Sequence, residues 1–322
     1  MRKRVKIAFA VVLLGIVGVI AWELSREREP EYQGKPLSKW LGEAADDSPG
    51  IPLDPEEKPA SRDAIRAMGT NALPGLIKML KAQDSPLKLN LLNLARKHSL
   101  WGFSVTRARK LNNRAVFGLC ALGTNANVAV PELMDLYLKR GDGTTAIALA
   151  NLSADGVLAL GQALTNPNII LTNKVPQLRF RMIYALGQLG ALARKADARP
   201  ERLARLELEA KLAASALLQC LNDPDVFIRI AAAQALVDLG IDQERAVAVF
   251  AKSLTDPNRR AKQQAAFYLL RLGPAAASAV PALVKALQDQ DELVRPVVSN
   301  ALKEISPGAA AKALANTNLP GL

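Results

Sequence analysis

The residues that most often perform chemistry are scarce in this chain of 322 residues. His98 is the only histidine, and Cys120 and Cys220 are the only cysteines. A zinc site needs three or four nitrogen, sulfur or carboxylate ligands, and acid–base catalysis needs a partner group within hydrogen-bonding reach. The sequence also lacks a glycine-rich phosphate loop, HExxH, GxSxG and a Ser-His-Asp set. We therefore expect a non-enzymatic protein with no catalytic residues, no bound metal and no cofactor.

Several acidic residues recur at a regular spacing, which indicates a structural role. The segments "LNDPDVFIRIAAAQALVDLG", "LTDPNRRAKQQAAFYLLRLG" and "LQDQDELVRPVVSNALKEIS" align without gaps. Their first aspartates and their basic residues recur at the same constant step: Asp223, Asp256 and Asp289, followed by Arg229, Lys262 and Arg295. Such a fixed period indicates an internal repeat.

Each copy has the pattern of a helix followed by a turn. Apolar residues recur at three- and four-residue steps, which is typical of a helix face. Asp223-Pro-Asp predicts a helix start with an aspartate as N-cap, and a closing glycine predicts the helix end. We read the same closing glycine at six positions: Gly69, Gly123, Gly156, Gly190, Gly240 and Gly273. A second helix, often begun by a proline, follows most of these glycines.

This arrangement resembles the HEAT repeat, including the short bilin-lyase-type HEAT-like repeat, over residues 60–305. The resemblance implies an all-α fold, a right-handed α-solenoid (ARM/HEAT superhelix) of about six helical hairpins. It also implies a hydrogen-bonded ladder of turn aspartates and basic residues, in which Lys262 cannot make the bidentate bond of an arginine. Residues 306–322 are expected to form a C-terminal tail.

The composition fits stacked helices with a core of small aliphatic side chains. Half of the residues are hydrophobic and only 4% are aromatic, and one helical hairpin must stack on its neighbours to bury its apolar face. The β-like run Asn168–Val175 is read as a loop insertion between two copies or as a stray strand. Cys120 and Cys220 fall in repeats two apart, beyond the reach of a disulfide, so we expect two buried free thiols.

Residues 1–24 have the pattern of a membrane-targeting segment. Four basic residues precede Ile7–Trp22, an uninterrupted run without a charged or polar side chain. Two readings stay open: an uncleaved transmembrane anchor that contacts the membrane through residues 5–24, or a signal peptide cleaved after Val19-Ile20-Ala21. Both place the solenoid outside the cytoplasm, either membrane-anchored or secreted.

Residues 25–59 are read as a linker that contains a short helix. Leu37, Trp40 and Leu41 share one face of a helix that Pro36 begins. This helix either caps the core of the first repeat or docks on a partner. With the segment "MGTNALPGLIKMLKAQDSPLK", it resembles the front end of exported bacterial HEAT proteins of the kind found in Verrucomicrobia.

Positive charge is concentrated in one window. Residues 78–114 contain nine basic residues and one acid, Asp84, for a net charge of +8. The gap between Gly69 and Gly123 is much longer than one repeat, so an insertion coincides with this charge. Insertions in solenoids form loops on one face. We take the window as the candidate partner-binding surface, and its residues are Lys88, Arg96, Lys97, Trp101, Phe103, Arg107, Arg109, Lys110 and Arg114.

Two classes of function remain. The leading hypothesis is a non-catalytic, envelope-exposed HEAT-repeat scaffold whose partner is a protein or an anionic macromolecule, bound along the concave face and the basic window. The alternative is an enzyme of the bilin-lyase-like or nucleic-acid-processing HEAT type, which requires a pigment pocket or aromatic and acidic residues in a basic groove. Nucleic acid is not an expected partner, because an exported chain meets little of it. The basic window itself is either a contact surface or a packed or solvated element without a partner.

Overall fold

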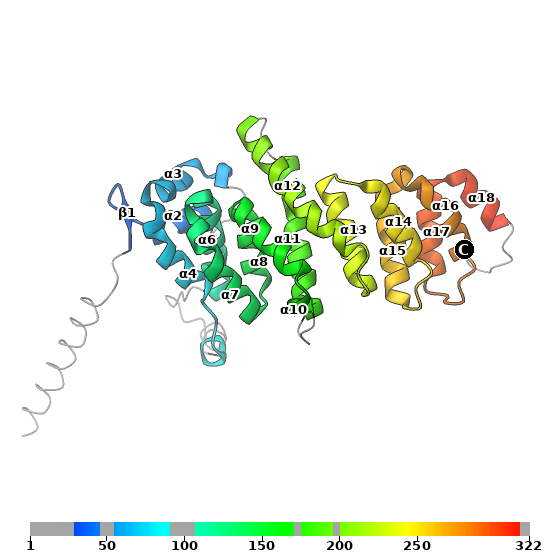
Figure 1. Ribbon diagram of the computed structural model, residues 1–322, viewed down its shortest axis with the longest axis horizontal. Helices are drawn as coiled ribbons and strands as arrows, with labels where there is room; N and C mark the ends of the chain where they lie inside the picture. Colours follow the sequence, from blue (N-terminus) through cyan, green and yellow to red (C-terminus); the bar gives the residue numbers. More distant parts are fainter. Residues whose placement is uncertain (1–28, 46–54, 91–106, 171–174, 196–199, 316–322) are drawn as a thin grey trace, which may run out of the picture.

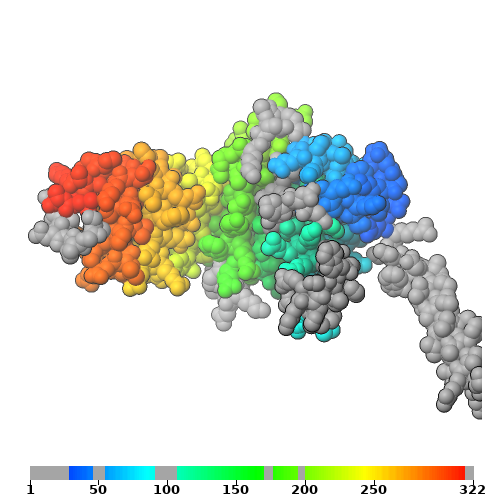
Figure 2. All heavy atoms as spheres, turned by 180° about the vertical axis from the view of Figure 1, so that it is seen from behind, coloured from blue at the N-terminus to red at the C-terminus, as the bar shows by residue number. Residues whose placement is uncertain are grey.

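The computed structural model describes residues 29–45, 55–90, 107–170, 175–195 and 200–315, which form an elongated stack of helix pairs (Figure 1). Seen from behind, the chain runs in sequence order from one end of this body to the other (Figure 2). Such an order means that each helix pair packs chiefly on its sequence neighbours, as in a repeat protein.

The helices are arranged in two layers. The A layer contains the first helix of each pair, and each of these packs on the next one along the chain. Its members are α3 (Pro59–Met68), α6 (Ala108–Leu122), α8 (Gly143–Leu152), α11 (Val175–Lys195), α13 (Val226–Leu239), α15 (Arg259–Leu272) and α17 (Arg295–Ile305). The B layer contains the second helices: α4 (Leu73–Leu80), α7 (Val130–Arg140), α9 (Ala154–Thr165), α12 (Pro200–Cys220), α14 (Gln243–Ser253), α16 (Val280–Ala286) and α18 (Pro307–Ala315).

The described residues therefore contain seven helix pairs, against the six or so that we expected. The additional pair is α17 with α18, which pack on each other. Residues 307–315, predicted as part of a tail, belong to this last pair. Short 3-10 helices make several of the connections: η1 (Pro55–Glu57), η2 (Gly69–Ala72), η3 (Gly123–Ala129) and η4 (Gly273–Ala279).

A short β-hairpin and a helix precede the first pair. The strands β1 (Glu31–Tyr32) and β2 (Lys35–Pro36) pair antiparallel, which we did not predict from the sequence. Helix α2 (Leu37–Ala45) then packs on α3 and α6, with Leu37 and Leu41 fully buried. This helix covers the end of the core that is formed by the first helix pair. The predicted membrane segment, residues 1–24, lies outside the described residues.

The core is continuous and consists mainly of leucine, alanine and valine. Phe117, Tyr137 and Phe250 are the largest side chains that it buries completely. The Tyr137 hydroxyl donates a hydrogen bond to the backbone oxygen of Leu178, which ties α7 to α11. The apolar stretch Arg259–Ala286 is long enough to cross a membrane by composition. Its helices α15 and α16, however, pack within the stack and are separated by η4.

The closing glycines proved to be of two kinds. Four have the positive φ predicted for a helix end: Gly69, Gly123, Gly240 and Gly273. The prediction was wrong for Gly156, which lies inside α9, and for Gly190, which lies inside α11. A Cβ atom at Gly190 would overlap the backbone oxygen of Asp238 in α13. Gly190 thus permits close approach of two A-layer helices.

A ladder of charged residues links successive pairs in the C-terminal half. Arg179 on α11 donates to the carboxylate of Asp223, in the turn before α13. Lys262 on α15 donates to the Asp289 carboxylate over 2.6 Å, in the turn before α17. Between these two pairs along the chain, a guanidinium nitrogen of Arg229 on α13 lies 3.8 Å from a carboxylate oxygen of Asp256, in the turn before α15.

Each pair of the ladder, which we call a rung, also orders the turn that contains its aspartate. The Asp223 side chain accepts a hydrogen bond from the backbone of Asp225 at 2.9 Å, and Asp225 in turn caps α13 through the backbone of Phe227 at 2.8 Å. The N-cap is therefore Asp225, the second aspartate of Asp223-Pro-Asp, which confirms the predicted aspartate cap. Arg229 donates to the backbone oxygens of Asp223 and Pro224, at 2.8 and 3.0 Å. Asp256 and Asp289 likewise accept a hydrogen bond from the backbone two residues later. The side chains of Asn258 and Asp291 then accept one from the backbone of Arg260 and Leu293.

Helices α11 and α12 are longer than their counterparts. Each contains 21 residues, whereas α13 and α14 contain 14 and 11. The N-terminal end of α12 projects beyond the stack in Figure 1. Of the run Asn168–Val175, predicted as a loop or strand, residues 168–170 belong to the short helix α10 (Pro167–Ile170), Val175 begins α11, and 171–174 lie outside the described residues.

Candidate binding surfaces

Part of the basic window is built into the junction between the first two pairs. The carboxylate of Asp84 accepts a hydrogen bond from the backbone of Ala108 at 3.0 Å and pairs with Lys88 at 2.6 Å. Because Ala108 is the first residue of α6, this contact joins the two ends of the inserted segment. The hydrogen bond from Lys88 is the largest cause of a pKa of Asp84 below its usual value.

The remaining candidate residues separate into three groups. Arg107, Arg109 and Lys110 are exposed at the start of α6, where Arg107 is the N-cap. Arg114 is half-buried, and its guanidinium lies so close to Gly42 of α2 that a Cβ there would be 3.3 Å away, so this arginine packs on the capping helix. Four further candidates, and the lone histidine, lie outside the described residues: Arg96, Lys97, Trp101, Phe103 and His98.

Other basic residues extend this surface. Lys81, at the end of α4, pairs with Glu132 at 2.7 Å, and its backbone oxygen accepts a hydrogen bond from Arg140 of α7 at 2.9 Å. Lys139 pairs with Asp135 within α7. We call this surface the basic edge, and its described members are Lys81, Lys88, Arg107, Arg109, Lys110, Lys139 and Arg140. Arg107, Arg109 and Lys110 are its exposed members next to the insertion.

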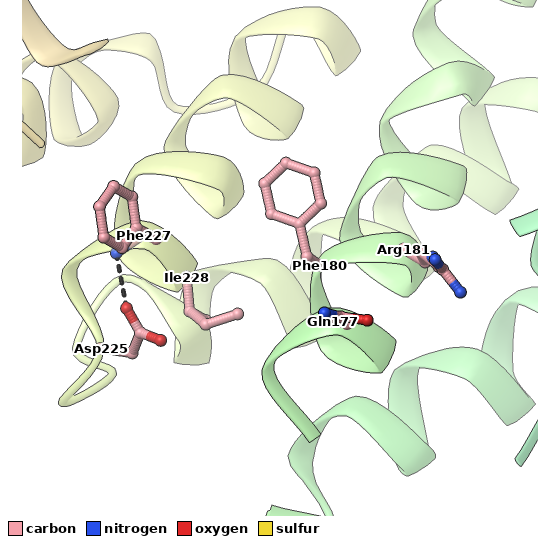
Figure 3. A pocket seen from close by; sticks show the side chains of 6 residues that line it. All are labelled: Gln177, Phe180, Arg181, Asp225, Phe227 and Ile228. Atoms are coloured by element: carbon pink, nitrogen blue, oxygen red, sulfur yellow. Dashed lines mark hydrogen bonds between the residues drawn. The ribbon is translucent and has the colours of Figure 1, made fainter. Parts of the chain in front are cut away.

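A second surface is an apolar crevice between α11 and α13. Phe180 of α11 and Phe227 of α13 lie on either side, with Ile228 between them (Figure 3). The crevice measures about 360 Å³, and Phe180 remains 43% exposed. Tyr184 follows one turn later on α11 and is 54% exposed.

The exposed aromatic residues share one face of the A layer. Tyr184 follows Arg179 at the same spacing at which Phe267 of α15 follows Lys262. Because Arg179 and Lys262 occupy equivalent rungs of the ladder, Tyr184 and Phe267 project from equivalent positions, and Phe267 is also half exposed. We did not predict this pattern from the sequence, because the aromatic residues lie in separate copies.

A third feature is a polar cavity of about 260 Å³ at the C-terminal ends of the first A-layer helices. The long helix α12 supplies one wall. Six polar or charged residues line it: Glu56, Arg66, Asn151, Glu201, Arg202 and Arg205. Arg202 is half-buried at this cavity.

Two buried polar groups beside this cavity are incompletely bonded within the described residues. Asn151 is 3% exposed; its amide nitrogen donates to Ile147, but its side-chain oxygen has no hydrogen-bond partner. Glu209 is 1% exposed and has no hydrogen bond to either oxygen, although Arg205 lies 3.2 Å away. Burial raises the pKa of Glu209, and the charge of Arg205 opposes this rise.

Positive charge also gathers around Arg66. Its guanidinium donates to the backbone oxygen of Ala121 at 2.9 Å and lies 3.5 Å from Glu56. Burial lowers the pKa of Arg66, and the nearby charges of Arg62 and Arg205 lower it further, against the opposing carboxylates. Arginine side chains are thus concentrated at this end of the cavity.

The described residues hold no group of three or more histidine, cysteine, aspartate or glutamate side chains that could bind a metal ion. Cys120 and Cys220 are both buried, and no disulfide joins them, as predicted. Burial is the largest cause of a Cys220 pKa of about 11, so this thiol is protonated and unreactive at neutral pH.

Comparisons with known proteins identify the repeat in part of the chain. Residues 168–270 match the family model of HEAT repeats. A solved crystal structure of an engineered protein is similar at 16% identity, covering 87% of this chain and 81% of that chain, with a TM-score of 0.30. No curated protein matches. The matched residues include α11 to α14 and most of α15, and they contain both partners of the Arg179–Asp223 and Arg229–Asp256 pairs of the ladder.

Proposed function

We propose that this protein is a non-catalytic scaffold that lies outside the cytoplasm and binds another protein on the exposed face of its A layer. The observation that carries this proposal is the apolar crevice between α11 and α13. The chain has few aromatic residues, and yet Phe180 and Tyr184 are left about half exposed beside it. Exposed aromatic side chains next to a pocket are typical of protein contact sites, where they supply most of the binding energy.

The basic edge supplies a second contact. Arg107 and Arg109 are exposed, and the window of residues 78–114 that contains them carries a net charge of +8 out of the +12 of the chain. Such a surface accelerates the approach of an acidic partner and contributes to orientation more than to affinity. The partner in this proposal therefore has an apolar side chain for the crevice and an acidic surface for the basic edge.

The proposed location is supported by the N-terminal sequence. Basic residues before an apolar segment are retained in the cytoplasm, so the chain that follows is exported. The likeness of the front end to exported bacterial HEAT proteins points the same way. The segment acts as an anchor in this proposal, and the scaffold holds its partner close to the membrane.

Site-specific photo-crosslinking tests the proposal. The full chain would carry a photoreactive residue at position 180, 184 or 158, the last replacing Leu158 of α9, which is similarly exposed on the B layer. We expect one and the same protein to cross-link at positions 180 and 184 but not at 158. The double variant Phe180→Ser, Tyr184→Ser should lose this partner, and Leu158→Ser should retain it. Equal retention by both variants would refute the A-layer site.

A further inference from the structure

The polar cavity has the features of a small-molecule site, independent of the proposed protein contact. A side-chain oxygen that is buried without a donor is costly, because it has lost its bond to water without replacement. Asn151 lines the cavity, and its side-chain oxygen is shielded from solvent without a donor. A ligand that bonds this oxygen must bring an N–H or O–H donor.

The arginines define the other end of the ligand. The Nε atom of Arg205 faces Glu209 at 3.2 Å, and the Nε atom of Arg66 donates to Ala121. An arginine has five N–H groups, so each guanidinium retains further donors for an acceptor group in the cavity. Guanidinium groups bind carboxylates in bidentate geometry, which favours an acidic group at this end.

Charge and volume narrow the class of ligand. Three arginines and two glutamates line the cavity, which leaves one excess positive charge. A monoanion neutralises this excess, whereas a dianion is repelled by Glu56 and Glu201. A volume of about 260 Å³ lies just below the usual range for ligand pockets, so the ligand must be small, with the acid and the donor close together.

We propose that this cavity binds a small organic carboxylate with a neighbouring N–H or O–H donor, with the carboxylate held between Arg66 and Arg205 and the donor bonded to Asn151. An acylated amino acid, a 2-hydroxy acid and the C-terminal residue of a peptide all present this chemistry. The site would make the scaffold responsive to a metabolite or to the end of a polypeptide.

Isothermal titration calorimetry of the full chain in a neutral detergent tests whether the cavity binds such an acid. The probes are N-acetylglycine and glycolate, with N-acetylglycine amide and inorganic phosphate as controls. We expect saturable binding of at least one acid, and binding at least about tenfold weaker for the amide and for phosphate, because each lacks the monoanionic carboxylate. Failure of both acids to bind would overturn the proposal.

Two variants locate the site. Asn151→Leu removes the acceptor within a similar volume, and Arg205→Gln removes a charge from a partly exposed side chain. Circular dichroism of each variant checks that the helices remain folded. Each should weaken acid binding about tenfold or more, whereas Arg260→Gln, on the exposed surface of α15, should not. If Asn151→Leu fails to fold, Arg205→Gln decides alone. Undiminished binding in the folded variants would refute the assignment.

A series of peptides distinguishes the two sources of such an acid. Affinity that rises from N-acetylglycine to its dipeptide and tripeptide homologues with a free C-terminus identifies the end of a polypeptide. Affinity that falls with length identifies a free small acid. The test is separate from that of the A-layer surface, because neither Phe180 nor Tyr184 lines this cavity.

Discussion

Arg179 and Asp223 form an ion pair whose two side chains are both buried, at 6% and 7% exposure. The guanidinium donates from α11 to the turn before α13, so the pair joins two successive helix pairs. Burial alone would lower the pKa of Arg179, but the hydrogen bond and charge of Asp223 outweigh it and raise the pKa above its usual value. The first rung of the ladder is therefore the one most shielded from water.

Removing the Arg179 side chain should destabilise the stack more than removing the basic side chain of either other pair in the ladder. Arg179→Ala leaves the Asp223 carboxylate buried without its cation, at a cost of about 3–5 kcal/mol. Arg229→Ala should cost about 1–3 kcal/mol, since it releases two backbone oxygens and a distant carboxylate. Urea unfolding of both variants measures the order. The exposed Arg260→Ala is the control and should change stability by less than about 0.5 kcal/mol. Equal midpoints for Arg179→Ala and Arg260→Ala would contradict the ladder.

Glu209 should oppose folding at neutral pH. Burial raises its pKa in the folded state, so folding favours the protonated carboxyl. Its contribution to stability is fully present below the unfolded pKa, near 4.5, and is lost as pH rises through the folded pKa. Glu209→Met should therefore raise the melting temperature at neutral pH, and the gain should shrink as the pH approaches the unfolded pKa. Glu207→Met, on an exposed position of the same helix, should show no such dependence on pH. A gain of the same size at both pH values would contradict the prediction.

A methyl group at Gly190 should separate two helices of the A layer. The added Cβ would overlap the backbone of Asp238, which no side-chain motion relieves. We expect Gly190→Ala to cost at least about 1–3 kcal/mol. Gly308→Ala serves as control, because a Cβ at that helical position meets no atom within 4 Å, and alanine there should stabilise α18 by about 0.5–1 kcal/mol. Thermal denaturation of the two variants should thus shift in opposite directions.

The ladder was predictable because its residues recur with one period. Arg229 and Asp256 are as far apart in the sequence as Lys262 and Asp289, whereas Arg179 and Asp223 are separated by a much longer stretch. The additional residues lengthen α11 and α12, and they displace Arg179 from the alignment of copies. The Arg179–Asp223 pair was missed for that reason alone. The same additional residues account for the long gap between Gly190 and Gly240.

The surfaces were less accessible to sequence reasoning. Asn151, Arg66 and Arg205 come from three helices and have no characteristic spacing, so only the fold brings them to one cavity. Gly190 was misread because glycine serves both turns and close helix packing, and the sequence does not distinguish these roles. Phe180 was missed because an aromatic residue within a helical pattern is expected in the core, whereas the arrangement of α11 and α13 leaves it half exposed.

A fusion at the C-terminus tests the proposed location of the stack. A reporter that is active only in the cytoplasm, attached after Leu322, should remain silent, because the basic residues before the apolar segment stay inside. The same fusion without residues 1–24 should be active and is the control for folding and expression. Activity of the full-length fusion would overturn the export of the stack.

The basic edge should bind an anionic surface without contributing to the core. Together, Arg107→Glu, Arg109→Glu and Lys110→Glu reverse three charges at the N-terminus of α6, where the helix dipole favours acidic residues. We expect the triple variant to keep its helix content and to lose retention on an immobilised sulfated polysaccharide. The wild-type chain should be released by salt as the Debye length falls below about 8 Å.

The control for this triple variant carries the same change in net charge at the other end of the stack. Reversal of Arg260, Lys285 and Lys303, which are exposed on α15, α16 and α17, should leave retention nearly unchanged. Trp101→Ala then separates the two readings of the insertion. If it lowers retention and leaves the melting temperature unchanged, the insertion is a contact surface. If it lowers the melting temperature instead, the insertion is a packed element. Equal loss of retention in the two charge-reversal variants would show that net charge alone, and not the basic edge, attracts the anion.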